Sequence, residues 1–456
     1  MSNQFREIDR SQPITLPGEM TGWLDGNDLA RFIVELVETL DTRAIEATYR
    51  GGGSAPYAPK MLLALLFYGY AKGIFSSRAL EQATYERIPV LYITGGEHPD
   101  HDTINTFRQR FLPEFTALFV QVLTIAHELG VLKLGDVSLD GTKIEANASK
   151  HQAMSWAYAQ RLEAQLKAEV QCLLERAAAV KDPGAVDLDW PAEVKRREDR
   201  LQKIAEVKAE IERRAQERYR QEQAAYEVKQ AERAAKEQAR GRKLGGKKPQ
   251  EPVPGPRPGD QINFTDGDSR IMPVAGGGFE QAYNAQATVT MGSLLIVGTQ
   301  VTQHPNDVQE LEPALAGLAT LPATLGTVDR LVADSGYFSG HNVERVVEAG
   351  IEPLIAVGRQ AHHAALEERL APVPDPPLHP TALEAMKHRL KTPAGKALYA
   401  RRKTTVEPVF GLIKAVIGFR RFSLRGLAKV TGEWLLVCLA YNLKRLCVLN
   451  QGVAAA

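Results

Sequence analysis

A long helical segment of mixed charge interrupts the part of the chain that has strand character, and it limits the folds that the chain can adopt. Residues 152–180 and 193–240 predict two polar helices joined by a turn around Asp182. The second helix carries a narrow apolar seam, which consists of Val194, Leu201, Ile204, Val207 and Ile211. This seam among mixed charges predicts an inserted helical hairpin or short coiled coil with a solvated surface, rather than a nucleic-acid-binding arm. The proline-rich residues 249–258 that follow predict an extended linker.

Strand signals lie on both sides of this insertion. Residues 136–140 predict a short strand before it, and residues 281–290 and 294–301 predict a hairpin after it, with Gly292 in the turn. Further strands are predicted at residues 328–333 and 351–357, and helices at residues 311–318 and 343–349. This order of elements predicts an α/β fold with a mixed sheet.

Residues 20–130 are mostly helical in pattern. Apolar residues recur at helical spacing in residues 28–40, 59–70 and 103–129, and Asp102 is the expected N-cap of the last helix. Basic side chains on these helices fit DNA binding and fit an ordinary solvated scaffold equally well. They are Lys72, Arg78, Arg87, Arg108 and Arg110.

Length and composition indicate a folded chain with more than one domain. At 456 residues the chain exceeds one ordinary core, so we expect two or three domains. The three cysteines form no C-x-x-C pair, which predicts a reduced, intracellular compartment without a disulfide framework or a zinc site. Residues 1–12 are polar and predict no secretory signal, and the apolar runs at residues 61–70 and 434–441 are too short to cross a bilayer.

Positive charge is concentrated in one C-terminal segment. Residues 387–429 contain twelve Lys or Arg and one carboxylate, Glu407, although the whole chain has a formal charge of only +1. A basic segment of this kind is typical of a surface that holds a phosphate backbone. Nearby cations favour the ionised form of a carboxylate, so we expect Glu407 to be available as a metal ligand.

Three acids occupy places where a ligand site is expected. Asp140 ends or interrupts the first strand, Asp334 follows the strand at residues 328–333, and Glu407 opens a C-terminal helix. Open α/β sheets bind ligands at the carboxyl ends of their strands, and Mg²⁺ prefers carboxylate oxygens. Each acid also has a structural alternative, since Asp140 fits a turn, Asp334 an Asx-turn or helix cap, and Glu407 a capping box with Thr404.

Four segments that occur in a fixed order carry a family resemblance. They are residues 140–147 (DGTKIEAN), 283–286 (YNAQ), 334–337 (DSGY) and 407–414 (EPVFGLIK). With them the chain resembles the insertion-sequence transposases of the DDE class, and motifs between residues 61 and 101 resemble the helical N-terminal domain of that group. The resemblance implies a ribonuclease-H-like domain flanked by helices, in which the catalytic residues Asp140, Asp334 and Glu407 bind two Mg²⁺ ions, with Mn²⁺ as a substitute.

The family also has a Tyr, an Arg and a Lys around its C-terminal Glu. Tyr399, Arg402 and Lys414 fill these positions as DNA-binding residues, although Arg402 precedes Glu407 by five positions rather than the four of some relatives, which leaves Lys403 as an alternative. Independently of the resemblance, a spacing of seven residues places Glu407 and Lys414 on one face of a helix, where the lysine can reach a phosphate. The basic surface is extended toward flanking DNA by Arg420, Arg421 and Arg425.

These expectations divide the chain into parts. We expect a helical DNA-binding or scaffold domain at residues 1–130, a catalytic domain formed by residues 131–150 and 260–449, an inserted hairpin with its linker at residues 151–259, and a tail at residues 450–456.

The expected function is metal-dependent strand cleavage and strand transfer by a transposase that binds the terminal inverted repeats of its insertion sequence and a target DNA. Two DNA ends must be handled together, so we expect a homodimer or a higher homo-oligomer, located with the nucleoid in a prokaryotic cytoplasm and not in a membrane. One alternative is a catalytically inactive DNA-binding protein derived from a transposase, which the intact acids oppose. The other, a structural coiled-coil protein, accounts only for residues 152–240.

Overall fold

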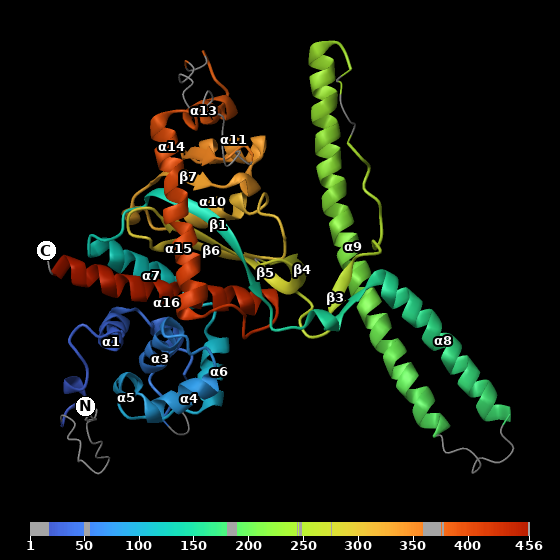
Figure 1. The fold of residues 1–456 in the computed structure, drawn as a ribbon, viewed down its shortest axis with the longest axis horizontal. Coiled ribbons are helices and arrows are strands. Elements are labelled where there is room, and N and C mark those ends of the chain that lie inside the picture. Colours follow the sequence, from blue (N-terminus) through green and yellow to red (C-terminus); the bar gives the residue numbers. More distant parts are fainter. Residues whose placement is uncertain are drawn as a thin grey trace, which may run out of the picture. The chain divides into compact units, whose positions relative to one another are not determined.

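The chain divides into two compact units, and it passes from one unit to the other several times along the sequence (Figure 1). The computed structural model describes residues 18–49, 55–179, 189–243, 245, 249–274, 276–358, 375 and 378–454, so the turn expected around Asp182 lies outside the described residues. Unit 1 comprises Met1–Glu145, Pro273–Gly276 and Ala282–Ala456, and unit 2 comprises Ala146–Met272 and Gly277–Gln281.

A mixed β-sheet places strands that are far apart in sequence side by side. Among the described residues it has six strands, in the order β4-β5-β1-β7-β8, and β6 also pairs with β5. The strands are β1 (Gly135–Glu145), β4 (Arg270–Pro273), β5 (Phe279–Thr290), β6 (Ile296–Thr302), β7 (Val328–Ala333) and β8 (Glu352–Ile355). The β5 strand is antiparallel to β1 and to β6, whereas β7 is parallel to β1 and to β8. This arrangement is ribonuclease-H-like and confirms the predicted α/β class with a mixed sheet.

The first strand is longer than the sequence pattern predicts. The strand predicted at residues 136–140 was expected to end or to be interrupted at Asp140, but β1 continues to Glu145. Its pairing with β5 extends from Val137, which is opposite Thr290, to Glu145, which is opposite Ala282. Long-range pairing outweighs the low strand propensity of this polar segment. Asp140 is therefore within a strand and not in a turn.

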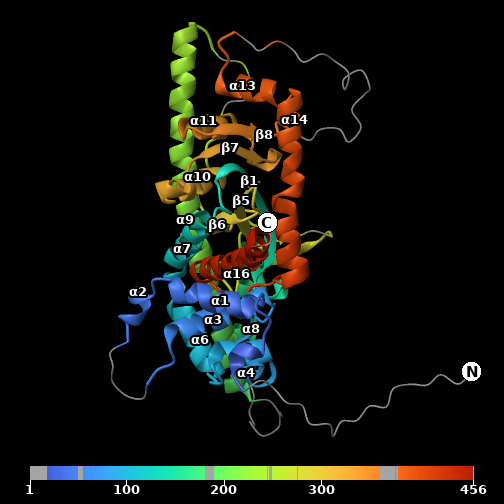
Figure 2. The same cartoon turned by 90° about the vertical axis from the view of Figure 1, so that its left-hand side faces the viewer.

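Helix α16 (Leu427–Ala454) connects the sheet to the N-terminal helices of unit 1. It packs against β6, α3 (Pro59–Ala71) and α7 (Phe115–Glu128), and Figure 2 shows it between the sheet and α1 (Leu29–Thr39). Trp434 donates from Nε1 to the carbonyl of Gln286 at 2.9 Å, and Asn442 pairs with both the backbone N–H and the carbonyl of Ile296. These bonds join α16 to β5 and β6. The helices that follow β6 are α10 (Leu311–Ala319), α11 (Gly340–Glu348), α13 (Ala382–Arg389), α14 (Pro393–Ala400), α15 (Val406–Gly411) and α16 (Leu427–Ala454).

The N-terminal region of unit 1 is helical, as predicted. Its helices are α1 (Leu29–Thr39), α2 (Arg43–Glu46), α3 (Pro59–Ala71), α4 (Ser77–Glu86), α5 (Ile88–Thr94), α6 (His101–Arg110) and α7 (Phe115–Glu128). The single helix expected at residues 103–129 is wrong, because Pro113 interrupts it between α6 and α7. The N-cap of α6 is Asp100 and not the expected Asp102, because the Asp100 side chain accepts a hydrogen bond from the Thr103 N–H at 2.6 Å.

A buried polar network ties these helices to α16. Glu433, which is fully buried, accepts bonds from the Tyr70 hydroxyl at 3.0 Å and from the backbone N–H groups of Ser423 and Leu424 at 2.9 Å. The buried guanidinium of Arg108 donates to the same hydroxyl at 3.0 Å. Burial raises the pKa of Glu433, while its hydrogen bonds and Arg108 act in the opposite direction. The network supplies a counter-charge and donors to a carboxylate that would otherwise be costly to bury.

Unit 2 is the inserted helical hairpin. It consists mainly of α8 (Trp156–Ala179) and α9 (Trp190–Arg240), with the two short strands β2 (Ala153–Ser155) and β3 (Gln261–Asn263) beside them. The two helices share an apolar core that includes Leu162 and Leu166 from α8 and Ile204, Val207 and Ile211 from α9. Ion pairs cross the same interface, as between Lys208 and Glu163 at 2.7 Å. The predicted seam of α9 is thus its contact with α8, and Figure 1 shows α9 continuing well beyond that contact.

Replacing the hairpin by a short linker should leave unit 1 folded. The Trp156 N–H donates to the Asp260 carbonyl at 2.7 Å, so a few Gly and Ser residues can replace residues 157–259. We expect a cooperative thermal transition within about 4 °C of that of the intact chain, because unit 1 has its own core. Circular dichroism measures this transition. As a control, replacing β6 by the same linker should abolish it, and its loss in the hairpin variant as well would contradict the independence of unit 1.

Candidate active site

Asp140 lies near the middle of β1 in a mostly buried position. Its Oδ1 accepts the N–H of Gly141 at 2.8 Å, and 17% of its side chain is exposed. Burial raises the pKa of Asp140 to about 6, and the charges of Asp334 and Asp307 add to that rise. The Gly141 N–H and Arg402 act in the opposite direction but do not cancel it. Asp140 therefore belongs to a group of acids that repel one another.

Asp334 lies beside Asp140 because of the strand register. Leu139 of β1 is paired with Ala333 of β7 in a parallel ladder, and each is followed directly by an acid. Asp334 also caps the 3₁₀ turn Ser335–Tyr337, where its Oδ1 accepts the Gly336 N–H at 2.7 Å. The turn role that the sequence allowed for Asp334 is therefore present, and it occupies one of the two carboxylate oxygens.

Arg402 joins Glu407 to Asp140. Its Nη1 donates to Asp140 Oδ2 at 3.0 Å, and its Nη2 donates to Glu407 Oε1 at 3.1 Å. Glu407 lies in the first turn of α15, which has no side-chain cap, and Thr404 donates instead to the carbonyl of Arg401 at 3.0 Å. The capping-box alternative for Glu407 is therefore wrong, because the carboxylate pairs with Arg402.

The three acids fit a hard divalent cation by their chemistry. Within the described residues, no group of three or more His, Cys, Asp or Glu side chains is arranged as a metal site, and Arg402 lies between Asp140 and Glu407. The donors are carboxylate oxygens, which Mg²⁺ and Mn²⁺ prefer. Burial raises the pKa of Asp140, and the charges of Asp334 and Asp307 add to that rise; a bound cation would favour the ionised carboxylate.

Side chains from β5 and from the loop after β6 complete the surroundings of these acids, although no sequence pattern indicates a site role for them. Asp307 accepts bonds from the side-chain amides of Asn284 at 2.6 Å and Gln286 at 2.8 Å, and its Oδ1 lies 3.7 Å from Lys143 Nζ. The Tyr337 hydroxyl donates to Gln286 Oε1. The motif at residues 283–286 contributed only to the resemblance, and no pattern around Asp307 distinguished it from other loop acids.

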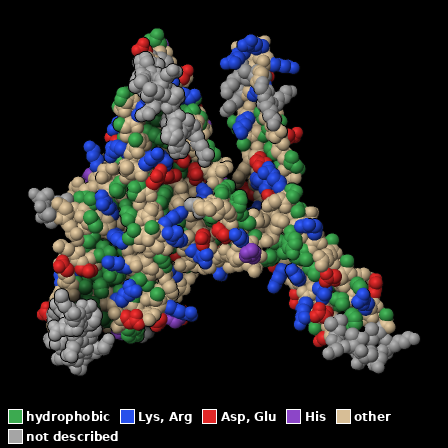
Figure 3. Space-filling model, viewed as in Figure 1, with side chains coloured by type: hydrophobic (Ala, Val, Ile, Leu, Met, Phe, Trp, Pro, Cys, Tyr) green, Lys and Arg blue, Asp and Glu red, His purple; other side chains and the backbone are tan. Residues whose placement is uncertain are grey.

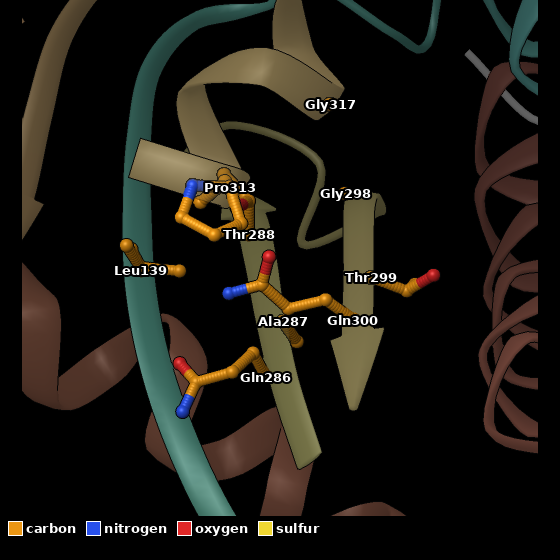
Figure 4. Close-up of a pocket in the computed structure, with 10 residues that line it drawn as sticks. Leu139, Gln286, Ala287, Thr288, Gly298, Thr299, Gln300, Pro313 and Gly317 are labelled. Carbon is orange, nitrogen blue, oxygen red and sulfur yellow. The ribbon is translucent and has the colours of Figure 1, made fainter. Parts of the chain in front are cut away.

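A small cavity lies between β1, β5, β6 and α10. Its volume is about 20 Å³, and its lining includes Leu139, Gln286 and Gly317 (Figure 4). A space of this size holds about one water molecule. The cavity is far too small for a nucleotide, so a substrate of the acids would have to approach them from the surface.

Two models of transposase families match the chain. Residues 253–443 match the "Transposase DDE domain", and residues 19–110 match the "Transposase domain (DUF772)". The first match includes Asp307, Asp334 and Glu407, while Asp140 precedes it. The chain belongs to the DDE transposases of insertion sequences. Searches of curated proteins and of solved structures found no match. Transposases of this class are DNA-binding enzymes of the polynucleotidyl-transferase type and normally use divalent metal ions.

The basic segment of the transposase is partly neutralised by its own acids. Four of its arginines pair with carboxylates of unit 1, namely Arg389 with Glu352, Arg401 with Asp136, Arg402 with Asp140 and Glu407, and Arg421 with Glu145. On the face shown in Figure 3, Lys and Arg side chains lie among acidic ones over both units. Net charge along the sequence therefore overstates the charge that this surface presents to DNA.

Lys414 does not follow the α-helical spacing that the sequence predicts. It lies in a π-helical turn, Leu412–Ile417, which follows α15 and ends at Gly418 with a φ of 86°. Its Nζ donates to the carbonyl of Lys143 on β1 at 2.9 Å. Burial lowers the pKa of Lys414, and the cations of Arg420 and Lys143 add to this effect. The expectation of two regular helical turns between Glu407 and Lys414 is wrong, because the wider turn alters the register.

The other DNA-binding candidates of the transposase differ in exposure. Tyr399 is partly buried against the cluster that includes Val332 and Leu354, and burial raises its pKa. Exposed positions are occupied by Lys403, Arg420, Arg421 and Arg425. Among the described residues, no helix is both long enough and apolar enough to span a membrane.

Proposed function

We propose that this transposase is active, and that it binds the terminal inverted repeats of its insertion sequence, cleaves DNA strands there and joins the freed 3′-hydroxyl ends to a target. One observation carries the proposal: a single guanidinium, that of Arg402, contacts Asp140 and Glu407, which are 267 positions apart in sequence, while Asp334 lies next to Asp140. A chain that had lost catalysis would have no chemical need to keep a mostly buried acid, Asp140, whose pKa is raised by burial and by the neighbouring charges of Asp334 and Asp307.

The acids Asp140, Asp334 and Glu407 would hold the metal, which we propose to be two Mg²⁺ ions, replaceable by Mn²⁺. Bound divalent ions would lower the pKa of the attacking hydroxyl group and would stabilise the negative charge on the leaving oxygen. Asp140 must be ionised for this role, and its raised pKa favours ionisation only above about pH 6. Phosphoryl transfer requires mainly positioning and charge stabilisation, so no covalent nucleophile of the protein is needed.

The cations of the site would bind the phosphate backbone. Arg402 can present its planar guanidinium to a phosphate in place of the two carboxylates that it now contacts. Lys414, with its ammonium group at β1, supplies a second positive charge. The outer contacts would come from Tyr399, Lys403, Arg420, Arg421 and Arg425, and they would add affinity and register with little sequence information.

Cutting and joining two ends in one reaction requires at least two subunits, so we propose a homodimer or a higher homo-oligomer on DNA. Residues 1–130 would contribute DNA binding or a scaffold, residues 131–150 and 260–449 catalysis, and residues 151–259 assembly or end binding, with residues 450–456 as a tail. The proposed location is the prokaryotic cytoplasm, in association with the nucleoid.

Incubation of the full-length protein with the ends of its own element tests the proposal. Sequencing the DNA on both sides of the reading frame provides these ends as matching inverted repeats. We expect nicking at the ends with Mg²⁺ or Mn²⁺ and none with EDTA, while a scrambled end serves as the control. End binding without nicking in either metal would instead support the inactive DNA-binding protein, and absence of both would refute a transposase function for this chain.

A further inference from the structure

We propose that Asp307 is a fourth acid of the metal site, and that the side-chain oxygen of Asn284 lies beside it as a further oxygen donor to the same divalent cation. This inference rests on the proposed function, because it extends the set of groups that would hold the metal. It concerns residues that the sequence pattern did not identify and that come from β5 and the loop after β6.

The orientation of Asp307 is fixed through one of its two oxygens. Oδ1 accepts the amide donors of Asn284 and Gln286 at 2.6 and 2.8 Å and lies 3.7 Å from Lys143 Nζ. Gln286 is itself held, because it accepts the hydroxyl of Tyr337. All three contacts involve Oδ1, so Oδ2 of Asp307 takes part in none of them, and 23% of the Asp307 side chain is exposed. Asp307 is thus a well-positioned carboxylate with one available oxygen.

Two glycines show that Asp307 lies close to Asp334 and to the backbone of β1 at the residue after Asp140. A Cβ atom placed on Gly336 would lie 2.9 Å from Asp334 Oδ1 and 3.5 Å from Asp307 Oδ2. A Cβ atom placed on Gly141, the residue after Asp140, would lie 2.8 Å from Asp307 Oδ1. Because Gly336 has no side chain, Asp334 and Asp307 both lie against the space beside its Cα atom, and the missing side chain of Gly141 leaves room for Asp307 next to β1.

Asn284 provides a second and independent indication of a ligand. Its side chain is fully buried, and its Nδ2 donates to the carbonyl of His304 at 3.1 Å and to Asp307. These bonds fix the orientation of the amide, and Oδ1 has no hydrogen-bond partner among the described residues. That oxygen would lie 2.9 Å from a Cβ atom on Gly141, in the same space as Asp307 Oδ1. A buried amide oxygen without a partner is costly, and a hard cation satisfies it.

The charges of the cluster agree with a bound cation. Asp140, Asp307, Asp334 and Glu407 carry four negative charges, and Lys143 and Arg402 contribute two positive ones. These six groups therefore carry a net charge of −2, which favours the binding of divalent cations. Three of the acids interact closely enough that Asp334 and Asp307 both disfavour ionisation of Asp140.

Titration of the full-length, DNA-free protein with Mn²⁺, followed by electron paramagnetic resonance, tests this assignment. Asp307→Asn keeps the size of the side chain and one acceptor oxygen, and it should weaken Mn²⁺ binding at least about tenfold. Asp329→Asn is the matched control, since Asp329 is an exposed acid at the opposite end of β7 and should bind Mn²⁺ as the unmodified protein does.

A second measurement needs no variant. Fe²⁺ with ascorbate cuts a polypeptide backbone next to a bound metal, and we expect cuts near residues 140, 334 and 307 of the unmodified protein.

If Asp140→Asn and Asp334→Asn weaken Mn²⁺ binding while Asp307→Asn does not, and no cut occurs near residue 307, the role of Asp307 is refuted and the proposed function stands. If none of the three variants weakens Mn²⁺ binding, the metal site itself is refuted.

Discussion

Strand cleavage should fall by at least about a thousandfold when Asp140 is replaced by asparagine. A carboxylate that holds a catalytic metal contributes several kcal/mol to transition-state stabilisation, and each 1.36 kcal/mol corresponds to a tenfold change in rate. We expect the same loss for Asp334→Asn and Glu407→Gln. Binding to the DNA ends should persist in all three variants, because phosphates are bound by the cations. Nicking of end DNA and electrophoretic mobility shifts measure the two properties separately.

The same Asp140 substitution should stabilise the metal-free protein. Its pKa rises from an ordinary 3.8 to about 6 in the folded state, so the unfolded state releases this proton at a lower pH than the folded state does. Stability is therefore lost as the pH rises from 3.8 to about 6, and the loss stays constant above that. A shift of this size corresponds to about 3 kcal/mol at pH 8. Asparagine carries no charge and removes the cost.

Thermal unfolding of both proteins in EDTA at pH 8 and at pH 4.5 measures this effect. The variant should unfold at a higher temperature at pH 8, and the difference should shrink at pH 4.5, where Asp140 is protonated in the folded protein. Asp329→Asn, at an exposed position, should show neither effect. Retained cleavage in all three acid variants, or a variant that is less stable at pH 8, would contradict the account of the site given above.

Replacing Glu433 by leucine should destabilise unit 1 by about 3–5 kcal/mol. The change leaves the buried guanidinium of Arg108 without its acid, and it leaves the N–H groups of Ser423 and Leu424 without an acceptor. The two charged groups are linked through the Tyr70 hydroxyl rather than by direct contact, and removing the carboxylate is costly because the guanidinium charge stays buried. Urea unfolding followed by fluorescence measures the change in the free energy of unfolding.

A double substitution separates the pair from simple loss of packing. Adding Arg108→Met to Glu433→Leu removes the stranded charge, so the double variant should be more stable than Glu433→Leu alone. Glu344→Leu, on the exposed side of α11, is the matched control and should change the free energy of unfolding by less than about 0.5 kcal/mol. If Glu433→Leu and Glu344→Leu have equal free energies of unfolding, the contacts of Glu433 between α16 and the N-terminal helices do not contribute to stability.

A strand that ends in a fully buried apolar segment could be predicted closely from the sequence. The strand at residues 328–333 matches β7 at both ends, because Leu331, Val332 and Ala333 are apolar and buried, although Asp329 and Arg330 interrupt the apolar pattern in its first half. The extension of β1 could not be predicted, because Gly141, Lys143 and Glu145 are residues that strands disfavour, and the segment depends on pairing with β5. The break at Pro113 was visible in the sequence, but the apolar spacing on either side of it masked the interruption.

The candidate site shows the same division between local and tertiary information. Asp334 was identifiable because it follows a buried strand directly, and the strand register then places it beside Asp140. No local sequence pattern indicated Asp307, since this loop residue is held in place by the side-chain amides of Asn284 and Gln286 on β5. The Thr404 and Glu407 pattern suggested a cap that is not formed, whereas Thr381 and Glu384 do form a capping box. An ion pair with Arg402 decides the conformation of Glu407.

The position of β1 at the centre of the sheet has a consequence for synthesis of the protein. Both of its hydrogen-bonding neighbours, β5 and β7, follow the inserted hairpin in the chain. At about 5–20 residues per second, the ribosome needs roughly 7–30 seconds after Glu145 to complete β5. During that interval β1 is an unpaired strand with two open edges, which are prone to aggregate. Nascent chains of this transposase should therefore depend on chaperones, and prematurely terminated ones should accumulate as insoluble material.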